Sequence, residues 1–369
     1  MINLNDFIIV DGVLCNYVGP GGAVEIPSGV TTIGKGAFYK KENVGSVLIP
    51  DGVTSIDNDA FAHCTYLRTV RFPQSLTTLR RGAFTGCSNL RSVVLPENVV
   101  SLGQMVFSGC RRLAELVLPP KLTAIRYGTF MGCQCVQTVV IPPDVTTIGQ
   151  NAFEGCRSLR AVALPPALKR IDHCAFRGCA KLKELRLPDG LTTIGDNAFS
   201  GCMNLETPGF PATLEAIGEG AFYGCHSLKE VLLPASVTSL GRGAFRGCTG
   251  LKYFYTPGVE AVQFYHQDVM LPAAMGYLCR PELYTDQEIA NGYLHYAATH
   301  KNLLVPLLLQ EDLVAGIATY AAGGKITADN VDTIFLEPAI EARATQCIAF
   351  LMDWKNSHIT RKKKTEWDL

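Results

Sequence analysis

Residues 228–248 read LKEVLLPASVTSLGRGAFRGC, and most of the preceding chain consists of variants of this stretch. The phenylalanine of its Ala-Phe pair recurs at intervals of 23 residues, which gives ten units in one register. Such a regular array predicts a solenoid, because a unit this short buries its apolar side only against neighbouring copies. The recurring phenylalanines are Phe38, Phe61, Phe84, Phe107, Phe130, Phe153, Phe176, Phe199, Phe222 and Phe245.

Each unit has the same internal order of elements. In the quoted copy, the alternation at residues 231–233 predicts a strand with one buried face. Pro234 cannot donate a backbone hydrogen bond, so it ends that strand. Residues 237–241, VTSLG, predict a second extended segment, with Gly241 at the bend. Residues 244–248, AFRGC, predict a short helical turn that places Phe245 in the core.

The pattern L-x-x-V-x-L-P-x-x-V-T-x-I-G-x-x-A-F-x-G-C resembles the BspA-like class of bacterial leucine-rich repeats over residues 27–257. That resemblance implies a parallel β-sheet on the concave face of a curved solenoid, with short strands and helical turns on the convex side. It also implies a role in protein binding or adhesion, since described relatives are often surface proteins.

The two ends of the chain depart from the repeat. Residues 1–26 predict a β-hairpin cap that turns at Asp11-Gly12. Residues 258–284 are expected to form a junction, residues 285–358 an all-α C-terminal region, and residues 359–369 a basic disordered tail. Helices are predicted near residues 285–299, 301–309, 311–322, 328–342 and 345–355, with Thr285 and Thr327 as N-caps. This region resembles the helical C-terminal segment of some intracellular members of the same repeat family. Its expected role is to cap the solenoid.

Nine of the fourteen cysteines lie three residues after a repeat phenylalanine. Equivalent positions in stacked strands are about 4.8 Å apart, which is too far for the Cβ spacing of a disulfide. We therefore expect small buried apolar side chains, with metal binding as the alternative. The nine are Cys64, Cys87, Cys110, Cys133, Cys156, Cys179, Cys202, Cys225 and Cys248.

Lysine plus arginine and aspartate plus glutamate number 33 each, so no overall charge favours nucleic acid or an anionic membrane. The first residues show no basic segment followed by a long apolar run, which predicts a cytoplasmic protein. The alternative, suggested by the family, is a secreted or cell-surface adhesin that binds a host or extracellular protein or glycan. No cofactor is expected, and no membrane or nucleic-acid partner. The expected state is a monomer or weak oligomer with a protein partner of unknown identity.

No catalytic or metal-binding arrangement is visible. The histidines are scattered, and Cys133-Gln134-Cys135 and His173-Cys174 are weak metal candidates. The prediction is a non-enzymatic protein-interaction scaffold.

The variable outward positions of the strands are the predicted partner-binding residues on the concave sheet. A run of small apolar residues at the centre of this surface indicates an interface. Valine is also a good strand former, so a purely structural role is the competing interpretation. The predicted residues are Arg71, Val94, Glu115, Val117, Thr138, Val140, Ala163, Glu184, Arg186, Glu230, Leu232, Tyr253 and Tyr255.

Two further features bear on this surface. Pro208 replaces an apolar strand residue and predicts either a local kink or a notch that admits a partner's backbone. A basic column precedes the outward positions, either as a solvated edge or as a contact for an acidic partner or phosphates. It comprises Arg68, Arg91, Arg160, Lys183, Lys229 and Lys252.

Overall fold

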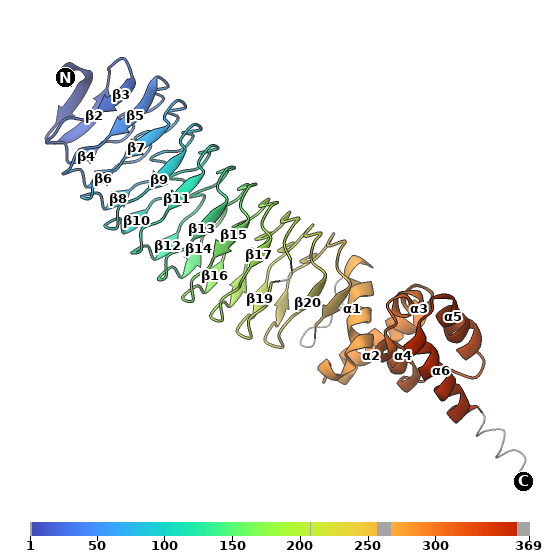
Figure 1. The fold of residues 1–369 in the computed structure, drawn as a ribbon. Coiled ribbons are helices and arrows are strands. Elements are labelled where there is room, and N and C mark those ends of the chain that lie inside the picture. The colour runs from blue at the N-terminus through green and yellow to red at the C-terminus, as the bar shows by residue number, and fades with distance from the viewer. Residues whose placement is uncertain (1, 207, 257–266, 360–369) are drawn as a thin grey trace, which may run out of the picture. The chain divides into compact units, whose positions relative to one another are not determined.

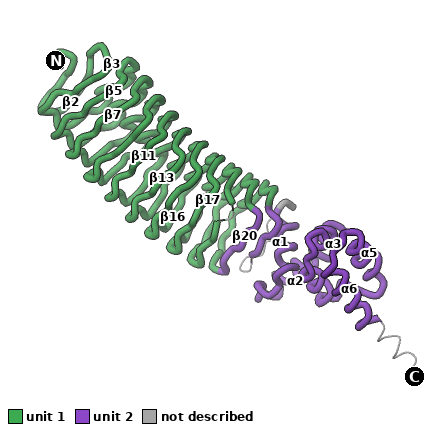
Figure 2. Tube along the Cα trace, in the orientation of Figure 1, with its two compact units in different colours: residues 1–228, 236–250 green, residues 229–235, 251–369 purple. Residues whose placement is uncertain are grey.

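The computed structural model describes residues 2–206, 208–256 and 267–359 of the 369-residue chain. The chain forms two compact units (Figure 2). Unit 1 comprises residues 1–228 and 236–250, and unit 2 comprises residues 229–235 and 251–369.

Unit 1 begins with the predicted hairpin. Strands β1 (Phe7–Val10) and β2 (Val13–Tyr17) pair antiparallel, and the turn between them has left-handed backbone at Asp11 and Gly12. A short 3-10 helix, Leu4–Asp6, precedes β1. Strand β2 then pairs parallel with the first repeat strand, and the Tyr17 ring stacks on Phe38 with centroids 4.9 Å apart. The hairpin therefore covers the first layer of the solenoid, as the sequence predicts.

One side of unit 1 carries the longer strands, which form the long-strand face (Figure 1). Paired residues on adjacent strands are 23 apart in sequence, such as Ser46 with Thr69, so the repeat period sets the register. Three ladders result, one of three strands, one of two and one of three. The strands are β3 (Gly22–Glu25), β5 (Val44–Leu48), β7 (Thr69–Arg71), β9 (Ser92–Val94), β11 (Glu115–Val117), β13 (Thr138–Val140), β15 (Ala161–Ala163) and β17 (Glu184–Leu185).

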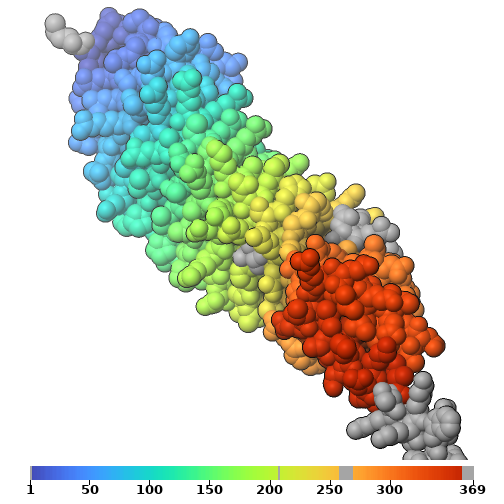
Figure 3. Space-filling model, turned by 45° about the vertical axis from the view of Figure 1, so that its right-hand side comes forward, coloured from blue at the N-terminus to red at the C-terminus, as the bar shows by residue number. Residues whose placement is uncertain are grey.

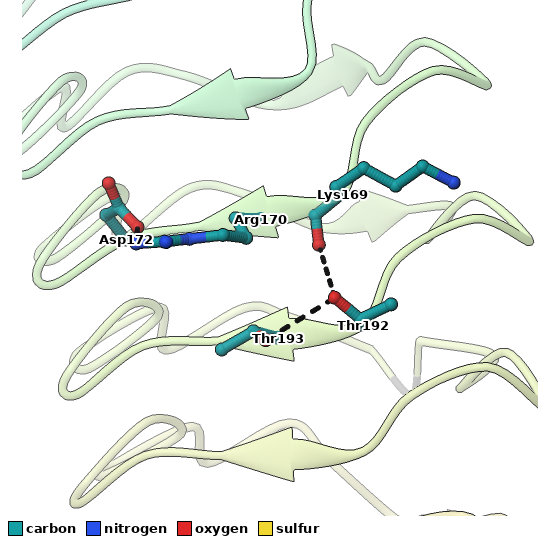
Figure 4. Close-up of polar contacts among 5 residues, drawn as sticks. All are labelled: Lys169, Arg170, Asp172, Thr192 and Thr193. Carbon is teal, nitrogen blue, oxygen red and sulfur yellow. Dashed lines mark hydrogen bonds and ion pairs between the residues drawn. The ribbon is translucent and has the colours of Figure 1, made fainter.

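A second side consists of two-residue parallel strands that correspond to the predicted Val-Thr-x-Ile segments. Threonine hydroxyls reinforce this side, because Thr192 Oγ1 donates to the Lys169 carbonyl of the previous layer at 3.2 Å (Figure 4). Thr54 and Thr77 make the same contact with the layer before them. The strands are β4 (Thr32–Ile33), β6 (Ser55–Ile56), β8 (Thr78–Leu79), β10 (Ser101–Leu102), β12 (Ala124–Ile125), β14 (Thr147–Ile148), β16 (Arg170–Ile171), β18 (Thr193–Ile194), β19 (Ala216–Ile217) and β21 (Ser239–Leu240).

The third segment of each unit is a hydrogen-bonded turn. The residue two positions before each repeat phenylalanine has a left-handed backbone, even where it is not glycine, as at Met105 with φ 57° and Cys174 with φ 54°. This conformation costs about 1–2 kcal/mol for a residue with a Cβ. Glycine, asparagine and aspartate occupy the other eight of these positions, in agreement with their tolerance of this region. The whole set is Gly36, Asp59, Gly82, Met105, Gly128, Asn151, Cys174, Asn197, Gly220 and Gly243.

The turns place a continuous stack of phenylalanine rings in the core. All ten rings are at most 2% exposed, and neighbouring centroids lie 4.7–5.8 Å apart with nearly parallel planes. Each ladder cysteine donates its thiol to the carbonyl of the phenylalanine 26 residues earlier, as Cys156 Sγ does to Phe130 O at 3.3 Å. The nine thiols are buried or nearly so and free, which confirms the expected small buried side chains.

These buried thiols predict a loss of stability in alkaline solution. Burial raises the pKa of Cys156 and of Cys202 from 9.0 to about 12. The pKa of each buried thiol is higher in the folded state than in the unfolded state. Its contribution to the free energy of unfolding is therefore complete below pH 9 and is lost as the pH rises toward 12. Each such thiol costs about 1.4 kcal/mol per pH unit in that window. Urea unfolding at pH 8 and at pH 10.5 measures this dependence, and the Cys156→Ala, Cys202→Ala double variant should show a clearly weaker one. An identical pH dependence in both proteins would contradict this account.

Unit 2 combines two strands with helices. Strands β20 (Glu230–Leu232) and β22 (Tyr253–Tyr255) pair parallel, and α1 (Gln267–Cys279) packs on β22. The backbones of α1 and β22 lie close together, since a Cβ added to Gly276 would lie 2.8 Å from the Phe254 carbonyl oxygen. Thr256 Oγ1 also lies 2.7 Å from Tyr293 Oη in the helical part. The remaining helices are a 3-10 turn (Pro281–Leu283), α2 (Gln287–Thr299), α3 (Lys301–Gln310), α4 (Val314–Ala322), a π-helical segment (Val331–Leu336), α5 (Glu337–Glu341) and α6 (Thr345–His358).

The helical region differs from its prediction in three places. Helix α1 lies within residues 258–284, which the sequence assigned to a junction; its low amphipathicity follows from burial on several sides. The N-cap of α2 is Asp286 rather than Thr285, because the Asp286 carboxylate accepts from the backbone N–H groups of Glu288 and Ile289. Thr327 does not cap a helix through its side chain; the Asn330 side chain accepts from the Thr327 N–H instead. Residues 258–266 of the predicted junction and residues 360–369 of the predicted tail lie outside the described residues.

Candidate protein-interaction face

The centre of the long-strand face in unit 1 is an exposed apolar stripe. Val94, Val117 and Val140 project outward and are 51%, 48% and 72% exposed. Val93 and Val139, which directly precede Val94 and Val140 on the same strands, are buried. This is the alternation expected of a strand with one face in the core. Three valines of this exposure in consecutive layers leave apolar surface in water.

Strand pairing brings these side chains together. Val94 lies opposite Val117 across β9 and β11, and Val140 lies opposite Ala163 across β13 and β15. Strand β11 also contacts β13. We call Val94, Val117, Val140 and Ala163 the apolar stripe.

Polar residues border this stripe. Glu115 and Thr138 are exposed two residues before Val117 and Val140 on the same strands, and Glu184 is exposed at the corresponding position of β17. Arg71 lies in the layer before Val94, and Arg186 lies in the layer after Ala163. Both are exposed, and both occupy the same strand position as the residues of the stripe. Neither arginine forms an ion pair with a residue in the described part of the chain, so each charge is available to a partner.

Two open depressions lie on this face. One, of about 510 Å³, is bordered by Ser46, Leu48, Thr69 and Arg71. The other, of about 570 Å³, is bordered by Ala161, Ala163, Glu184, Arg186 and Gly209. Small residues border the second depression on both sides of the Arg186 layer, with Ala161 and Ala163 in the layer before it and Gly209 in the layer after it. The sequence prediction did not include Gly209, although the small residues Ala161, Ala163 and Gly209 at outward positions could have indicated a hollow.

The layer at Pro208 interrupts the strands, as its sequence predicts. The ladder β13-β15-β17 ends at β17, and no strand is present at residues 208–210. Pro208 itself occupies the buried phase of the strand, where it has no N–H to donate. A Cβ added to Gly209 would meet no atom within 4 Å. The neighbouring Thr207 lies outside the described residues.

The last four predicted contact residues belong to unit 2. Glu230 and Leu232 are exposed on β20, and Leu232 is 43% exposed. Tyr253 is partly buried on β22. Tyr255 was expected to be an exposed aromatic, but it is only 4% exposed, with the Arg280 guanidinium 5.5 Å from its ring centroid. The cause is that α1 and the residue that follows it cover this strand, so Tyr255 is unavailable to a partner.

The surface is continuous from layer to layer within unit 1, because side chains fill the space between the turns (Figure 3). Of the weak metal candidates, Cys133 donates its thiol to the Phe107 carbonyl, and Cys135 is exposed. Cys174 Sγ lies 3.2 Å from His173 Nε2, without a third ligand. Across residues 2–206, 208–256 and 267–359 no group of three metal-ligating side chains was found. In the same ranges no helix has the length and apolar character needed to cross a bilayer.

The repeat pattern matches an established family description. The BspA type Leucine rich repeat region, in six copies, matches residues 31–160 and 146–266. The chain belongs to this family. BspA-type repeats generally act as protein-interaction scaffolds. A search of curated proteins finds no match.

Solved structures include several leucine-rich repeat proteins that are similar to this BspA-type chain. A T. pallidum leucine-rich repeat protein is 30% identical, with 52% of this chain and 82% of that chain covered and a TM-score of 0.40. A leucine rich cell surface protein from Faecalibacterium prausnitzii is 26% identical, with coverage of 69% and 74% and a TM-score of 0.44. The pneumococcal vaccine antigen PcpA is 21% identical, with coverage of 70% and 82% and a TM-score of 0.46.

Proposed function

We propose that this BspA-type chain is a non-enzymatic scaffold that binds a protein partner on the long-strand face of unit 1. The observation that carries the proposal is the exposure of Val94, Val117 and Val140 in three consecutive layers. Exposed valines stabilise a strand only modestly, whereas burying them under a partner removes apolar area from water at about 25 cal/mol per Å².

The border of the stripe supports the same proposal. Interfaces commonly have an apolar centre and a polar rim, and the stripe is bordered by Glu115, Thr138 and Glu184 and ended by Arg71 and Arg186. The core below is formed by stacked layers, so the face is a rigid surface that loses little conformational entropy on binding.

Replacing Val94, Val117 and Val140 together by glutamate should abolish binding of the partner. The experiment retains proteins from a lysate on the immobilised full chain and identifies them by mass spectrometry. Each substitution places a charge where the partner would bury apolar surface, and we expect at least a 100-fold loss of affinity, because each buried unpaired charge costs several kcal/mol. Thermal unfolding should change little, because all three side chains project into solvent.

The matched control carries the same change in charge elsewhere on unit 1. Tyr39, Val100 and Tyr127 are 44%, 51% and 39% exposed and lie on turns or beside the two-residue strands. Their simultaneous replacement by glutamate should leave partner binding intact. Equal binding by the Val94, Val117, Val140 variant and the wild type would refute the proposed face.

A further inference from the structure

The charges around the apolar stripe select one class of partner. We consider the long-strand positions of residues 68–186, together with the one residue that precedes each strand. The exposed charged residues at these positions are five arginines, two glutamates and Lys183. Lys183 is paired with Glu206 at 3.4 Å. None of the five arginines forms an ion pair with another described residue. The arginines are Arg68, Arg71, Arg91, Arg160 and Arg186, and the glutamates are Glu115 and Glu184.

This excess of positive charge is local. The whole chain has a formal net charge of zero, so the arginine excess on this face is not a consequence of overall composition. Unpaired arginines at the ends and along one flank of the exposed valines match a ligand that carries carboxylates at both ends and along one side of an apolar surface. A basic ligand would be repelled at both ends of the stripe, by Arg71 and by Arg186.

The spacing of the layers selects the conformation of that ligand. Neighbouring parallel strands are about 4.8 Å apart, whereas one turn of an α-helix rises about 5.4 Å. A helix lying along the stripe therefore presents about one turn per layer, and the mismatch over five layers is only about 3 Å. An extended strand repeats its side chains every 6.6–6.8 Å and loses register within about two layers. A polyproline helix repeats about every 9.3 Å and uses only alternate layers.

We propose that the long-strand face of unit 1 binds an acidic amphipathic α-helix whose apolar side lies along Val94, Val117, Val140 and Ala163. Its acidic residues contact Arg71 and Arg186 at the ends and Arg91 and Arg160 along one flank. Arg71 and Arg186 are five layers apart, so the helix spans about 24 Å, or about 16 residues. This inference rests on the proposed function and adds the class of partner to it.

Three synthetic peptides of about 16 residues test the inference with the full chain. The first is alanine-rich, with one leucine per turn on one side and glutamates on both flanks. The second replaces each glutamate by lysine, and the third keeps the glutamates but contains two prolines that prevent a helix. Fluorescence anisotropy at low salt should give at least ten-fold tighter binding of the first peptide than of the other two. Binding of the first peptide should weaken as salt is added, because salt screens exposed charges.

Two variants assign the interaction to this face. Arg71→Glu combined with Arg186→Glu should reverse the preference, so that the lysine peptide binds more tightly than the glutamate peptide. The matched control, Arg81→Glu with Arg126→Glu, changes two exposed arginines on the turn side and should keep the wild-type order. Equal affinities for the glutamate and lysine peptides, or equal affinities for the helical and proline-containing peptides, would overturn the helix assignment.

The two proposals fail in different ways. If the Val94, Val117, Val140 to glutamate variant loses its natural partner while the acidic peptide does not bind the wild type, the proposed face stands and the helix assignment is wrong. If the acidic peptide binds the wild type and this variant equally, the peptide binds outside the apolar stripe and the helix assignment is wrong, whereas the proposed face is refuted only by unchanged binding of the natural partner to this variant.

Discussion

Replacing Phe153 by alanine should destabilise unit 1 by about 3–5 kcal/mol, the usual cost of removing a buried aromatic side chain. Phe153 is fully buried, and its ring centroid lies 5.3 Å from that of Phe130 and 5.2 Å from that of Phe176. The substitution therefore opens a cavity in one layer and removes two stacking contacts. Urea unfolding followed by circular dichroism measures the change in the free energy of unfolding.

Phe153 lies in a middle layer of the solenoid, so its replacement affects the contacts with two neighbouring layers. Each layer contacts only its neighbours, so a defect in the middle weakens the interfaces on both sides of it. Tyr127→Ala is the control, because it also removes an aromatic ring but from a side chain that is 39% exposed. The control should cost less than about 1 kcal/mol. A loss of similar size in both variants would show that the phenylalanine stack is not the principal support of the layers.

Replacing Gly276 by valine should separate α1 from β22 in unit 2. A Cβ at this position would lie 2.8 Å from the Phe254 carbonyl oxygen and 3.1 Å from its carbon, so the helix has to move away from the strand. Overpacking of this kind costs about 1–3 kcal/mol. The displacement also opens the cover over Tyr255, which is 4% exposed in the native protein.

Limited proteolysis of Gly276→Val should therefore show faster cleavage in unit 2, while cleavage within unit 1 stays unchanged. Gly209→Val is the control, because a Cβ there meets no atom within 4 Å. It should behave like the wild type in the same assay. Equal protease resistance of the Gly276 variant and the wild type would show that the strand tolerates a larger side chain against it.

The repeat period predicted most of unit 1, and the physical reason is stacking. A strict interval of 23 residues fixes the strand register, so pairs such as Ser46 with Thr69 follow from the alignment of copies. The burial of Phe153 and Cys156 also follows, since each occupies the same position in every layer. The left-handed residue in each turn was missed, although glycine, asparagine and aspartate recur at that position.

The ends of the array were harder to predict because no repeat constrains them. Helix α1 is buried on several sides and contains Pro272, so it lacks the one-sided apolar pattern by which helices are identified. The missed helix also explains the error at Tyr255, whose strand position alone indicated exposure. Val94, Val117 and Val140 were placed correctly on an exposed surface, because alternation along a strand depends only on local geometry.

Photo-crosslinking at Val117 tests most directly whether the apolar stripe contacts the partner. A photoreactive phenylalanine derivative replaces Val117 in one protein and Val100 in another; these valines are 48% and 51% exposed, and Val100 lies beside the two-residue strands. Irradiation of the complex with the partner retained from the lysate should give a crosslinked product from position 117 and none from position 100. Crosslinking from position 100 alone, or equally from both positions, would contradict binding on the long-strand face.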